Sequence, residues 1–505
     1  MRGAGLAAKY FMWIALGLCA VLLAEFNVLV VKNGDLWISS GLNGHLQTES
    51  ARASKGRLID REGGVWPSRA DDARAALLAQ KDTEQAQTEM DAIYHSFFDP
   101  AYGVAQLESR RLFGMKDKFS GFTGLSRLET RKGYDVTLTL SSSLTIDLFQ
   151  ALRATGASSA AAIVGNYATG EILAYTNLPS VSVGTALVSP YAEDYDRKEA
   201  WMLNRVLRVT YQPGSIQKIA TALAAIRYKA DIGLPDLNRV IFTCEGQLEM
   251  PGGGTIYCEN GRHGDLTFTQ AFARSCNCAF AMIADQLGPE RLMEMCEELG
   301  YNQSLTFMDK TIDQQSRFEL PPQVTSFALG WSGAGQGVTS DVQLQTLPYH
   351  MLLLTGAIAN GGQARQPYAV KDVVTRDGGK IVIPERKPSY VSGKTLALDA
   401  VMAADARALM ESVCGENGTA AALGSQMKSM GFTAAAKTGT AEFDVTARRL
   451  DGQGYDFTRG FNSWIVCFVK EIPVAMVVAA QNPSSQSAAV NVAREILPKA
   501  IEVLR

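Results

Sequence analysis

The sequence predicts an α+β protein in which both ends of the main domain contribute strands to one sheet. The chain has 505 residues, of which 47% are apolar and 20% charged, a composition typical of globular proteins with a full core. Strand-like segments lie early and late in this domain, at 160–164, 171–175, 434–440, 463–469 and 474–480. Helical, often Ala-rich patterns lie between and after them, at 216–230, 269–287, 344–360 and 495–504. Early strands, a helical middle and late strands favour a single sheet with helices packed on it.

An apolar stretch from Tyr10 to Val31 predicts one transmembrane helix. Its 22 residues would span about 33 Å as a helix, against a hydrocarbon core of about 30 Å. Arg2 and Lys9 precede it without an acid, so the positive-inside rule predicts a cytoplasmic tail over residues 1–9 and an external remainder. No convincing small-x-small cleavage site follows the stretch, which favours a retained single-pass anchor over a signal peptide.

Two polar residues, Glu25 and Asn27, lie inside this anchor. Polar groups are costly in lipid and often face a partner helix. The alternative is that both lie near the outer interface, where water reaches them, and the sequence leaves the two interpretations open.

The segment 32–154 is predicted to form a small α+β domain between the anchor and the main domain, which covers 155–505. It contains, in order, an alternating segment, an amphipathic helix, a strand and a second helix, at 55–63, 71–98, 134–140 and 143–152. The net charge of −3 argues against nucleic acid as the main partner. No glycine-rich phosphate-binding string stands at a strand-to-helix junction, so no nucleotide cofactor is expected, and no cofactor or metal is predicted.

The cysteines Cys244 and Cys258 flank a turn-like segment, Met250-Pro-Gly-Gly-Gly-Thr255. If the flanks pair as a hairpin, the two thiols could face each other and form a disulfide. Two buried free thiols are an equally good interpretation. A zinc site that also uses His263 is judged improbable, because only three ligands are in view.

The string Ser215-Ile-Gln-Lys218 marks the start of a predicted buried helix, after Pro213 and Gly214. Ser215 would stand where free backbone N–H groups favour developing negative charge, with Lys218 on the same face. A serine hydroxyl needs a neighbouring base, and a lysine can be that base only when burial or another cation lowers its pKa. The alternative is an ordinary helix-start serine. The chain repeats the spacing at Ser425-Gln-Met-Lys428, where no buried helix follows and the ordinary interpretation is preferred.

Two further strings could complete a site for acyl transfer through a serine ester. Ser275-Cys-Asn277 precedes an apolar run, so Ser275 could relay a proton and Asn277 could accept from Lys218; the alternative is a plain helix cap. Lys437-Thr-Gly439 lies on a predicted strand. Lys437 would add positive potential and lower the pKa of Lys218, Gly439 would let an extended peptide approach, and Thr438 and Thr440 could bind a substrate carboxylate. The Thr440 and Ser215 N–H groups could form an oxyanion hole. The alternative is an edge strand with a surface lysine.

In this order the three strings resemble those of the serine D,D-transpeptidases, the superfamily of penicillin-binding proteins and serine β-lactamases. Other segments that are similar to penicillin-binding proteins are Gly56-Arg-Leu-Ile-Asp-Arg-Glu-Gly63, Thr169-Gly-Glu-Ile-Leu-Ala174, Leu203-Asn-Arg205, Tyr211-Gln-Pro-Gly-Ser215, Phe242-Thr-Cys-Glu-Gly246, His263-Gly264, Gly335-Gln-Gly337, Ala359-Asn-Gly-Gly362 and Lys437-Thr-Gly-Thr-Ala-Glu442. The segment Phe461-Asn-Ser-Trp-Ile465 matches the usual strand after the third motif only loosely.

The resemblance implies a monofunctional, class B-like penicillin-binding protein, most similar to the short penicillin-binding protein A-like branch. It implies the transpeptidase fold, an antiparallel sheet with a helical subdomain over 155–505, and a pedestal (penicillin-binding protein dimerisation-like) domain over 32–154. The catalytic residues would be Ser215, Lys218, Ser275, Asn277 and Lys437, and the substrate-binding residues Thr438, Gly439 and Thr440. Partners would be peptidoglycan stem peptides, β-lactams and a polytopic membrane glycosyltransferase.

Three functions compete. The first is a peptidoglycan D,D-transpeptidase that cross-links stem peptides through a Ser215 acyl-enzyme and is inhibited by β-lactams. The second is a D,D-carboxypeptidase or a β-lactamase-like hydrolase, in which water resolves the ester. The third is a β-lactam sensor or a catalytically silent scaffold of the cell-wall machinery.

Overall fold

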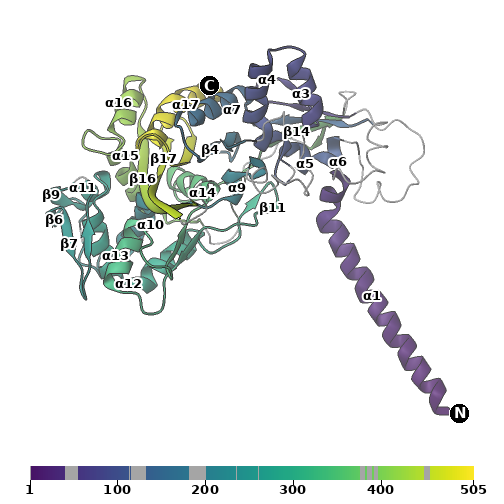
Figure 1. The fold of residues 1–505 in the computed structure, drawn as a ribbon, viewed down its shortest axis with the longest axis horizontal. Coiled ribbons are helices and arrows are strands. Elements are labelled where there is room, and N and C mark those ends of the chain that lie inside the picture. Colours follow the sequence, from purple (N-terminus) through teal and green to yellow (C-terminus); the bar gives the residue numbers. More distant parts are fainter. Residues whose placement is uncertain are drawn as a thin grey trace.

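The computed structural model describes residues 2–39, 55–99, 101–112, 114, 132–180, 201–234, 236–259, 261–375, 381–383, 389, 391, 396–448 and 455–505 (Figure 1). The helices are α1 (Arg2–Ser39), α3 (Ala70–Leu78), α4 (Thr83–Ile93), the π-helical η1 (Tyr94–Phe98), α5 (Val104–Leu107), α6 (Ser109–Leu112), α7 (Ser142–Ala154), α9 (Arg205–Arg208), the 3-10 turn η2 (Gly214–Gln217), α10 (Lys218–Arg227), α11 (Phe268–Ala273), α12 (Asn277–Glu298), α13 (Ser326–Ala334), α14 (Pro348–Ala359), α15 (Ala400–Val413), α16 (Ala421–Ser429) and α17 (Ala488–Leu504).

The strands form two five-stranded sheets and several two-stranded ones. They are β1 (Arg57–Ile59), β2 (Val65–Pro67), β3 (Tyr134–Leu138), β4 (Ser159–Asn166), β5 (Ile172–Leu178), β6 (Val240–Cys244), β7 (Gln247–Glu249), β8 (Thr255–Tyr257), β9 (Gly264–Thr267), β10 (Thr306–Phe307), β11 (Lys310–Thr311), β12 (Arg317–Glu319), β13 (Gln343–Gln345), β14 (Val370–Thr375), β15 (Ile381–Ile383), β16 (Ala434–Arg448), β17 (Tyr455–Val469) and β18 (Val474–Gln481).

The main sheet is antiparallel and has the order β16-β17-β18-β4-β5. Strands from both ends of the main domain therefore meet, as the sequence predicted, and β18 pairs with β4 along their whole length. Almost every residue of β4 and β18 is buried, so both faces of the sheet are covered. The helix pairs α7 with α17 and α14 with α15 pack on it. Strand β16 lies at an end of this order, so one edge of it has no partner among the described strands.

The second large sheet has the order β15-β14-β3-β1-β2. Strands β1, β2 and β3 come from the segment before residue 155, whereas β14 and β15 follow α14 in the main domain. Strand β14 pairs antiparallel with β3 from Val370 opposite Leu138 to Thr375 opposite Tyr134. The N-terminal region therefore shares a sheet with a segment more than two hundred residues further along the chain.

The prediction of one continuous helix over 71–98 is wrong. The structure has α3, then a turn, then α4, whose N-terminus is capped by the Asp82 side chain accepting from the Gln85 N–H. The helix expected over 269–287 is also divided, because α11 ends at Ala273 and α12 begins at Asn277. Ser275 lies in that break with a positive φ of 55°, which no helix interior tolerates.

The N-terminal apolar stretch forms the long helix α1, which extends away from the rest of the molecule (Figure 1). Its candidate membrane span is Tyr10–Leu29, with a mean hydropathy of 2.0 and no residue buried against the protein. Inside it the Asn27 amide donates to the Leu23 carbonyl at 2.7 Å, which satisfies part of its polarity within the helix. The helix fits a membrane anchor or a signal sequence.

Candidate active site

Ser215 lies in the 3-10 turn η2, directly before the buried helix α10. Gly214 precedes it with a φ of 54°, and a Cβ on Gly214 would stand 2.3 Å from the Thr440 carbonyl oxygen on β16. Only glycine therefore lets the turn pack directly against this strand. The result is that a half-buried serine hydroxyl stands beside the free edge of the main sheet.

Lys218 is the first residue of α10, and its side chain is completely buried. Its Nζ donates to Ser215 Oγ at 2.7 Å and to Asn277 Oδ1 at 2.6 Å. It also contacts Ser275, at 2.9 Å from the carbonyl oxygen and 3.2 Å from the hydroxyl. Burial lowers the pKa of Lys218 to about 8. A lysine with that pKa can accept the proton of a serine hydroxyl near neutral pH.

Ser275 and Asn277 lie in the break between α11 and α12, and neither of them is the helix cap. The N-cap of α12 is Cys276, whose sulfur accepts from the Ala279 N–H at 3.4 Å. The Asn277 amide group instead donates to the Tyr257 carbonyl at 3.0 Å, while its oxygen accepts from Lys218. The plain-cap interpretation of these two side chains is therefore wrong, because both are used by the lysine cluster.

Lys437 lies on β16, and its side chain is also completely buried. Its Nζ donates to Ser275 Oγ at 3.0 Å and to the Thr438 carbonyl at 2.9 Å. Burial, and then the charge of Lys218, lower the pKa of Lys437 well below its ordinary value. The two amines share the Ser275 hydroxyl and repel each other when both are charged, so the pair holds one proton more readily than two. The surface-lysine interpretation of Lys437 is wrong.

The remaining residues predicted on β16 have different surroundings. Thr438 and Thr440 are half-buried, and Thr438 Oγ1 lies 2.6 Å from Thr419 Oγ1. A Cβ on Gly439 would meet the Pro213 carbonyl at 2.8 Å and Ile216 Cγ2 at 3.0 Å. The glycine is thus required where β16 packs on the turn that carries Ser215, a reason that the sequence analysis did not consider.

Several residues that support the site had no role in the sequence analysis. The indole N–H of Trp464 and the amide of Asn462 donate to the Gln212 carbonyl, at 2.9 and 3.3 Å, which holds the turn before Ser215. Gly335 packs so tightly on Gly214 that a Cβ would stand 1.8 Å from the Gly214 carbonyl oxygen. The aromatic residue in a strand adjoining the third motif was the available signal for Trp464, but a buried strand residue is usually only core.

The structure confirms the hairpin between Cys244 and Cys258 and brings further cysteines close to it. Strands β7 and β8 do pair around the turn, from Gln247 opposite Tyr257 to Glu249 opposite Thr255. The Cys244 and Cys258 sulfurs lie 3.7 Å apart and are not bonded. The premise that only three metal ligands are in view is wrong, because Cys276 lies with Cys244, Cys258 and His263 in one group.

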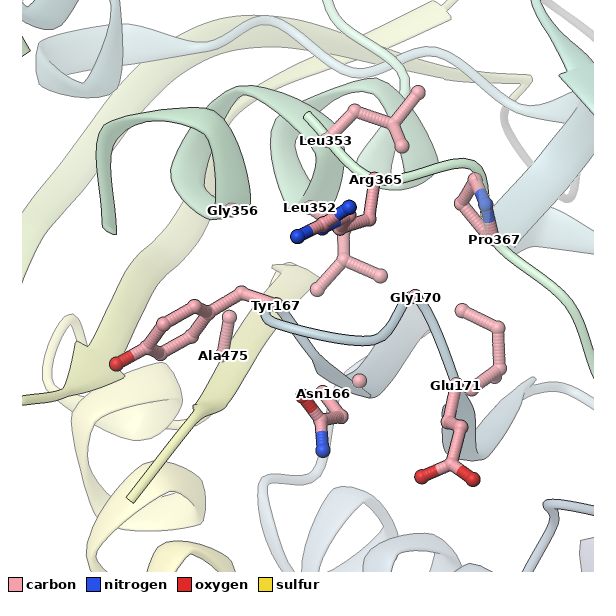
Figure 2. Close-up of a pocket in the computed structure, with 12 residues that line it drawn as sticks. Asn166, Tyr167, Gly170, Glu171, Leu352, Leu353, Gly356, Arg365, Pro367 and Ala475 are labelled. Atoms are coloured by element: carbon pink, nitrogen blue, oxygen red, sulfur yellow. The ribbon is translucent and has the colours of Figure 1, made fainter. Parts of the chain in front are cut away.

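A separate pocket lies between α14 and the turn that joins β4 to β5, and its lining also includes Ala475 on β18 (Figure 2). It has an empty volume of about 310 Å³ and is lined by the turn between β4 and β5, by α14 and by the segment before β14. Figure 2 shows Arg365 lying between α14 and the turn that carries Tyr167 and Gly170. None of the eight predicted site residues lines it.

A serine and two buried lysines, contributed by Ser-x-x-Lys, Ser-x-Asn and Lys-Thr-Gly strings, are the arrangement of serine enzymes that form an acyl-enzyme. The family model described as the penicillin binding protein transpeptidase domain matches residues 160–500 of this chain. The chain therefore belongs to the penicillin-binding protein transpeptidase family.

Relatives and solved structures agree with this family. Stage V sporulation protein D of Bacillus subtilis is 27% identical over 332 residues, which are 64% of this chain and 45% of that protein. Peptidoglycan D,D-transpeptidase PbpA of Mycolicibacterium smegmatis is 29% identical over 294 residues, which are 55% of this chain and 54% of that protein. The chain thus spans about half the length of the relatives it matches.

The fold is that of solved transpeptidases. Penicillin-binding protein A from M. tuberculosis, solved as an imipenem acyl-enzyme complex, has a TM-score of 0.65 at 19% identity, over 90% of this chain and 99% of that one. The D,D-transpeptidase domain of a peptidoglycan glycosyltransferase from Eggerthella lenta has a TM-score of 0.63 at 22% identity, over 90% and 99% of the two chains. The predicted transpeptidase fold is confirmed.

Proposed function

We propose that this protein is a peptidoglycan D,D-transpeptidase with Ser215 as its nucleophile. The observation that carries the proposal is the Lys218 amine, completely buried and 2.7 Å from Ser215 Oγ, with Lys437 reached through the shared Ser275 hydroxyl. The hydrogen-bond partners of the Lys218 amine among the described residues are hydroxyl, carbonyl and amide oxygens, all of them neutral. This environment favours the neutral amine that a general base requires.

The cluster supports a two-step acyl transfer. Ser215 Oγ attacks the carbonyl carbon of the D-Ala-D-Ala peptide bond while its proton passes to Lys218. The C–N bond breaks as the leaving amine takes a proton, which the Ser275 hydroxyl can relay because it contacts both lysines. The amine of a second stem peptide then attacks the ester, gives up a proton along the same route and restores the Ser215 hydroxyl.

The substrate backbone would bind along the outer edge of β16. An unpaired strand edge binds an extended peptide by adding it as a further strand. The Thr440 backbone lies next to Gly214. This proximity supports an oxyanion hole made by the Ser215 and Thr440 N–H groups. Thr438 and Thr440, both half-buried on this strand, are proposed to bind the substrate carboxylate.

The proposal also covers the cellular location of the protein and its binding partners. The apolar helix α1 would remain as a single-pass anchor, with its N-terminus in the cytoplasm and the transpeptidase domain outside the bacterial membrane. Substrates would be peptidoglycan stem peptides, β-lactams would acylate the same serine, and a polytopic membrane glycosyltransferase would be the partner. The acyl-enzyme of M. tuberculosis penicillin-binding protein A and the glycosyltransferase that contains the E. lenta domain support these assignments by analogy.

The test is mass spectrometry of the full chain after treatment with benzylpenicillin, followed by peptide mapping. We expect one added penicilloyl group on the peptide that contains Ser215, stable for many minutes, and none in a Ser215→Ala variant. The Ser425→Ala variant is the matched control and should be acylated as the wild type is.

A second assay separates transfer from hydrolysis. Incubation with a D-Ala-D-Ala donor and an amine acceptor should yield the amide product in preference to the free acid. Rapid loss of the penicilloyl group, or the free acid alone, would identify a hydrolase. No adduct on correctly folded protein would identify a silent scaffold and overturn the proposal.

A further inference from the structure

A second group of reactive side chains lies directly behind the Ser275 loop. It consists of Cys244, Cys258, His263 and Cys276, hereafter the thiol cluster. The three cysteines are buried and the histidine is half-buried, and all four ligand atoms lie within 4.8 Å of one another. The thiol cluster joins the small strands β6 to β9 with the helices α11 and α12, at the end of the molecule remote from α1 (Figure 1).

The spacing of these atoms matches the edges of a metal-centred tetrahedron. With Zn–S bonds of about 2.3 Å and Zn–N bonds of about 2.0–2.1 Å, a tetrahedral site has S–S edges of about 3.8 Å and S–N edges of about 3.6 Å. The observed Cys244–Cys258 and Cys258–Cys276 sulfur distances are 3.7 and 3.6 Å. The distance from the Cys244 sulfur to His263 Nδ1 is 3.4 Å. Bonded disulfide sulfurs would lie about 2.0 Å apart.

A metal ion at this position would link small sheets that are otherwise held by their packing on α11, α12 and α13. Strands β6 with β9 and β7 with β8 form two separate two-stranded sheets. Isolated two-stranded sheets are marginally stable in water, and small regions of this kind are commonly fixed by a metal or by disulfides. Cys244 ends β6, Cys258 follows β8 and His263 precedes β9, so one ion would fix all of these strands to the N-terminus of α12 at Cys276.

We propose that the thiol cluster is a structural zinc site, in which Zn²⁺ is held by the sulfurs of Cys244, Cys258 and Cys276 and by Nδ1 of His263. Three thiolates and one imidazole in a tetrahedral arrangement form a closed zinc site with no open position. Each thiol releases its proton when the ion binds. The Cys276 sulfur already accepts a backbone N–H bond from Ala279, a contact that also stabilises a thiolate at a helix N-terminus.

The position of Cys276 gives the metal a role beyond stability. This residue stands between Ser275 and Asn277, both of which contact Lys218. The Asn277 amide also donates to the carbonyl of Tyr257, the neighbour of Cys258. The metal would therefore hold in place a loop that adopts an uncommon positive φ at Ser275. Cys244, Cys258 and His263 act as positioning residues in this respect, because they contact none of the reacting groups.

The first experiment measures metal content in the purified full chain, by elemental mass spectrometry and by colorimetric titration with Zn²⁺ after reduction and chelation. We expect about one zinc per chain, taken up again by the chelated protein. Cys244→Ser and His263→Asn should lower the content below about a fifth of one equivalent, because a site with one ligand missing binds zinc far more weakly.

Two cysteine variants are matched controls. Cys278 lies 3.4 Å from the Cys258 sulfur but donates to the Ile256 carbonyl and is outside the proposed ligand set. Cys414 is a half-buried thiol elsewhere, at the end of α15. Cys278→Ser and Cys414→Ser should both retain about one zinc. Loss of the metal in Cys278→Ser would overturn the ligand assignment.

Alkylation of the unreduced, denatured chain distinguishes the metal from a disulfide. Zinc-bound cysteines are all alkylated once the chain unfolds, whereas a Cys244–Cys258 disulfide leaves two of them unreactive. A disulfide, or a reduced chain that takes up no Zn²⁺, would overturn the proposal. These readouts do not depend on acyl transfer, so they can fail or succeed separately from the proposed function.

The positioning role, which rests on the proposed function, has its own readout. Hydrogen exchange of the amides in residues 275–279 should accelerate by roughly tenfold or more when zinc is removed or His263 is replaced by Asn. Penicillin acylation should slow in parallel. Unchanged exchange in this loop on zinc removal would show that the ion does not position it.

Discussion

The chain contains the five-residue pattern Gly-Ser-x-x-Lys twice, at 214–218 and at 424–428, and the two copies have almost nothing else in common. The first begins the buried helix α10, and its lysine amine lies within hydrogen-bond distance of four oxygens on three residues. The second lies inside α16, where both Ser425 and Lys428 are exposed to solvent. Spacing therefore brings a serine and a lysine to one helical face in both places, but only burial and partners prepare one pair for chemistry.

The glycines of the two copies show the same contrast. Gly214 has a φ of 54° and packs on the Thr440 carbonyl of β16, so it aligns the serine with a strand edge. Gly424 has an ordinary helical backbone, and a Cβ there would stand 1.9 Å from the Cys414 carbonyl oxygen. Both positions require glycine, one for the site and one for packing alone.

Replacing the two lysines is the strongest test of this comparison. Lys218→Ala should slow penicillin acylation by about 10²–10⁴-fold, the usual cost of removing a general base. Lys428→Ala should leave the rate unchanged, because an exposed helix lysine contributes little. The measurement is the second-order rate constant for a fluorescent penicillin. Equal effects of the two variants would show that burial of Lys218 is irrelevant to the reaction.

Replacing the two glycines separates stability from activity. Gly214→Ala and Gly424→Ala should both lower the free energy of unfolding by about 1–3 kcal/mol, since each introduces a methyl group into a filled space. Only Gly214→Ala should also slow acylation, by about 10²-fold, because it displaces Ser215 from β16. Denaturant unfolding gives the first quantity and labelling of the folded fraction gives the second. A slow Gly424→Ala variant would mean that the two regions are coupled.

The pH dependence tests the state of Lys218. Its pKa is lowered to about 8 by burial, and the neutral amine is the form that accepts a proton. The acylation rate constant should therefore rise by about tenfold per pH unit below pH 7 and level off above the pKa. Stopped-flow labelling between pH 5.5 and pH 9.5 would record the profile. A rate that is flat across this range would exclude Lys218 as the titrating base.

The smallest expected effect concerns the support of the Ser215 turn. Trp464→Phe removes one of two donors to the Gln212 carbonyl, which should lower the free energy of unfolding by about 1 kcal/mol and slow acylation by a few-fold. Trp331→Phe, a half-buried aromatic substitution on α13, is the control for the loss of an indole. If both variants behave alike, the hydrogen bond to Gln212 has no special role.

Much of the architecture could be predicted from the sequence. The strands at both ends of the main domain favoured one sheet built from both ends, and the pairing of β18 with β4 confirms it, whereas the strand order itself was not predicted. The break between α3 and α4 was missed, but the sequence contained a signal for it, because Asp82 stands three residues before Gln85 as a capping residue. The break at Ser275 could not be predicted from local sequence, since this residue adopts a positive φ in a loop that contacts Lys218 and Lys437, both distant along the chain.

The polar groups of the candidate site could be chosen from local strings, but their supports could not. Ser215, Lys218 and Lys437 stand in recognisable strings, whereas the packing of Gly214 on Thr440 depends on strand β16, which is far away in the sequence. The fourth member of the thiol cluster was missed for the same reason. Cys276 belongs to a different motif from Cys244 and Cys258, and only folding brings it to them.

The sheet that the N-terminal region shares with the segment after α14 has a practical consequence for the design of truncated forms. Strands β14 and β15 belong to the main domain but complete the N-terminal sheet beside β3. A truncated protein that starts at residue 155 would expose the β3-facing edge of β14, a surface prone to intermolecular pairing. Because β14 follows α14, which packs on the main sheet, a displacement of the N-terminal sheet would pull on α14 and through it on the sheet whose edge strand β16 carries Lys437.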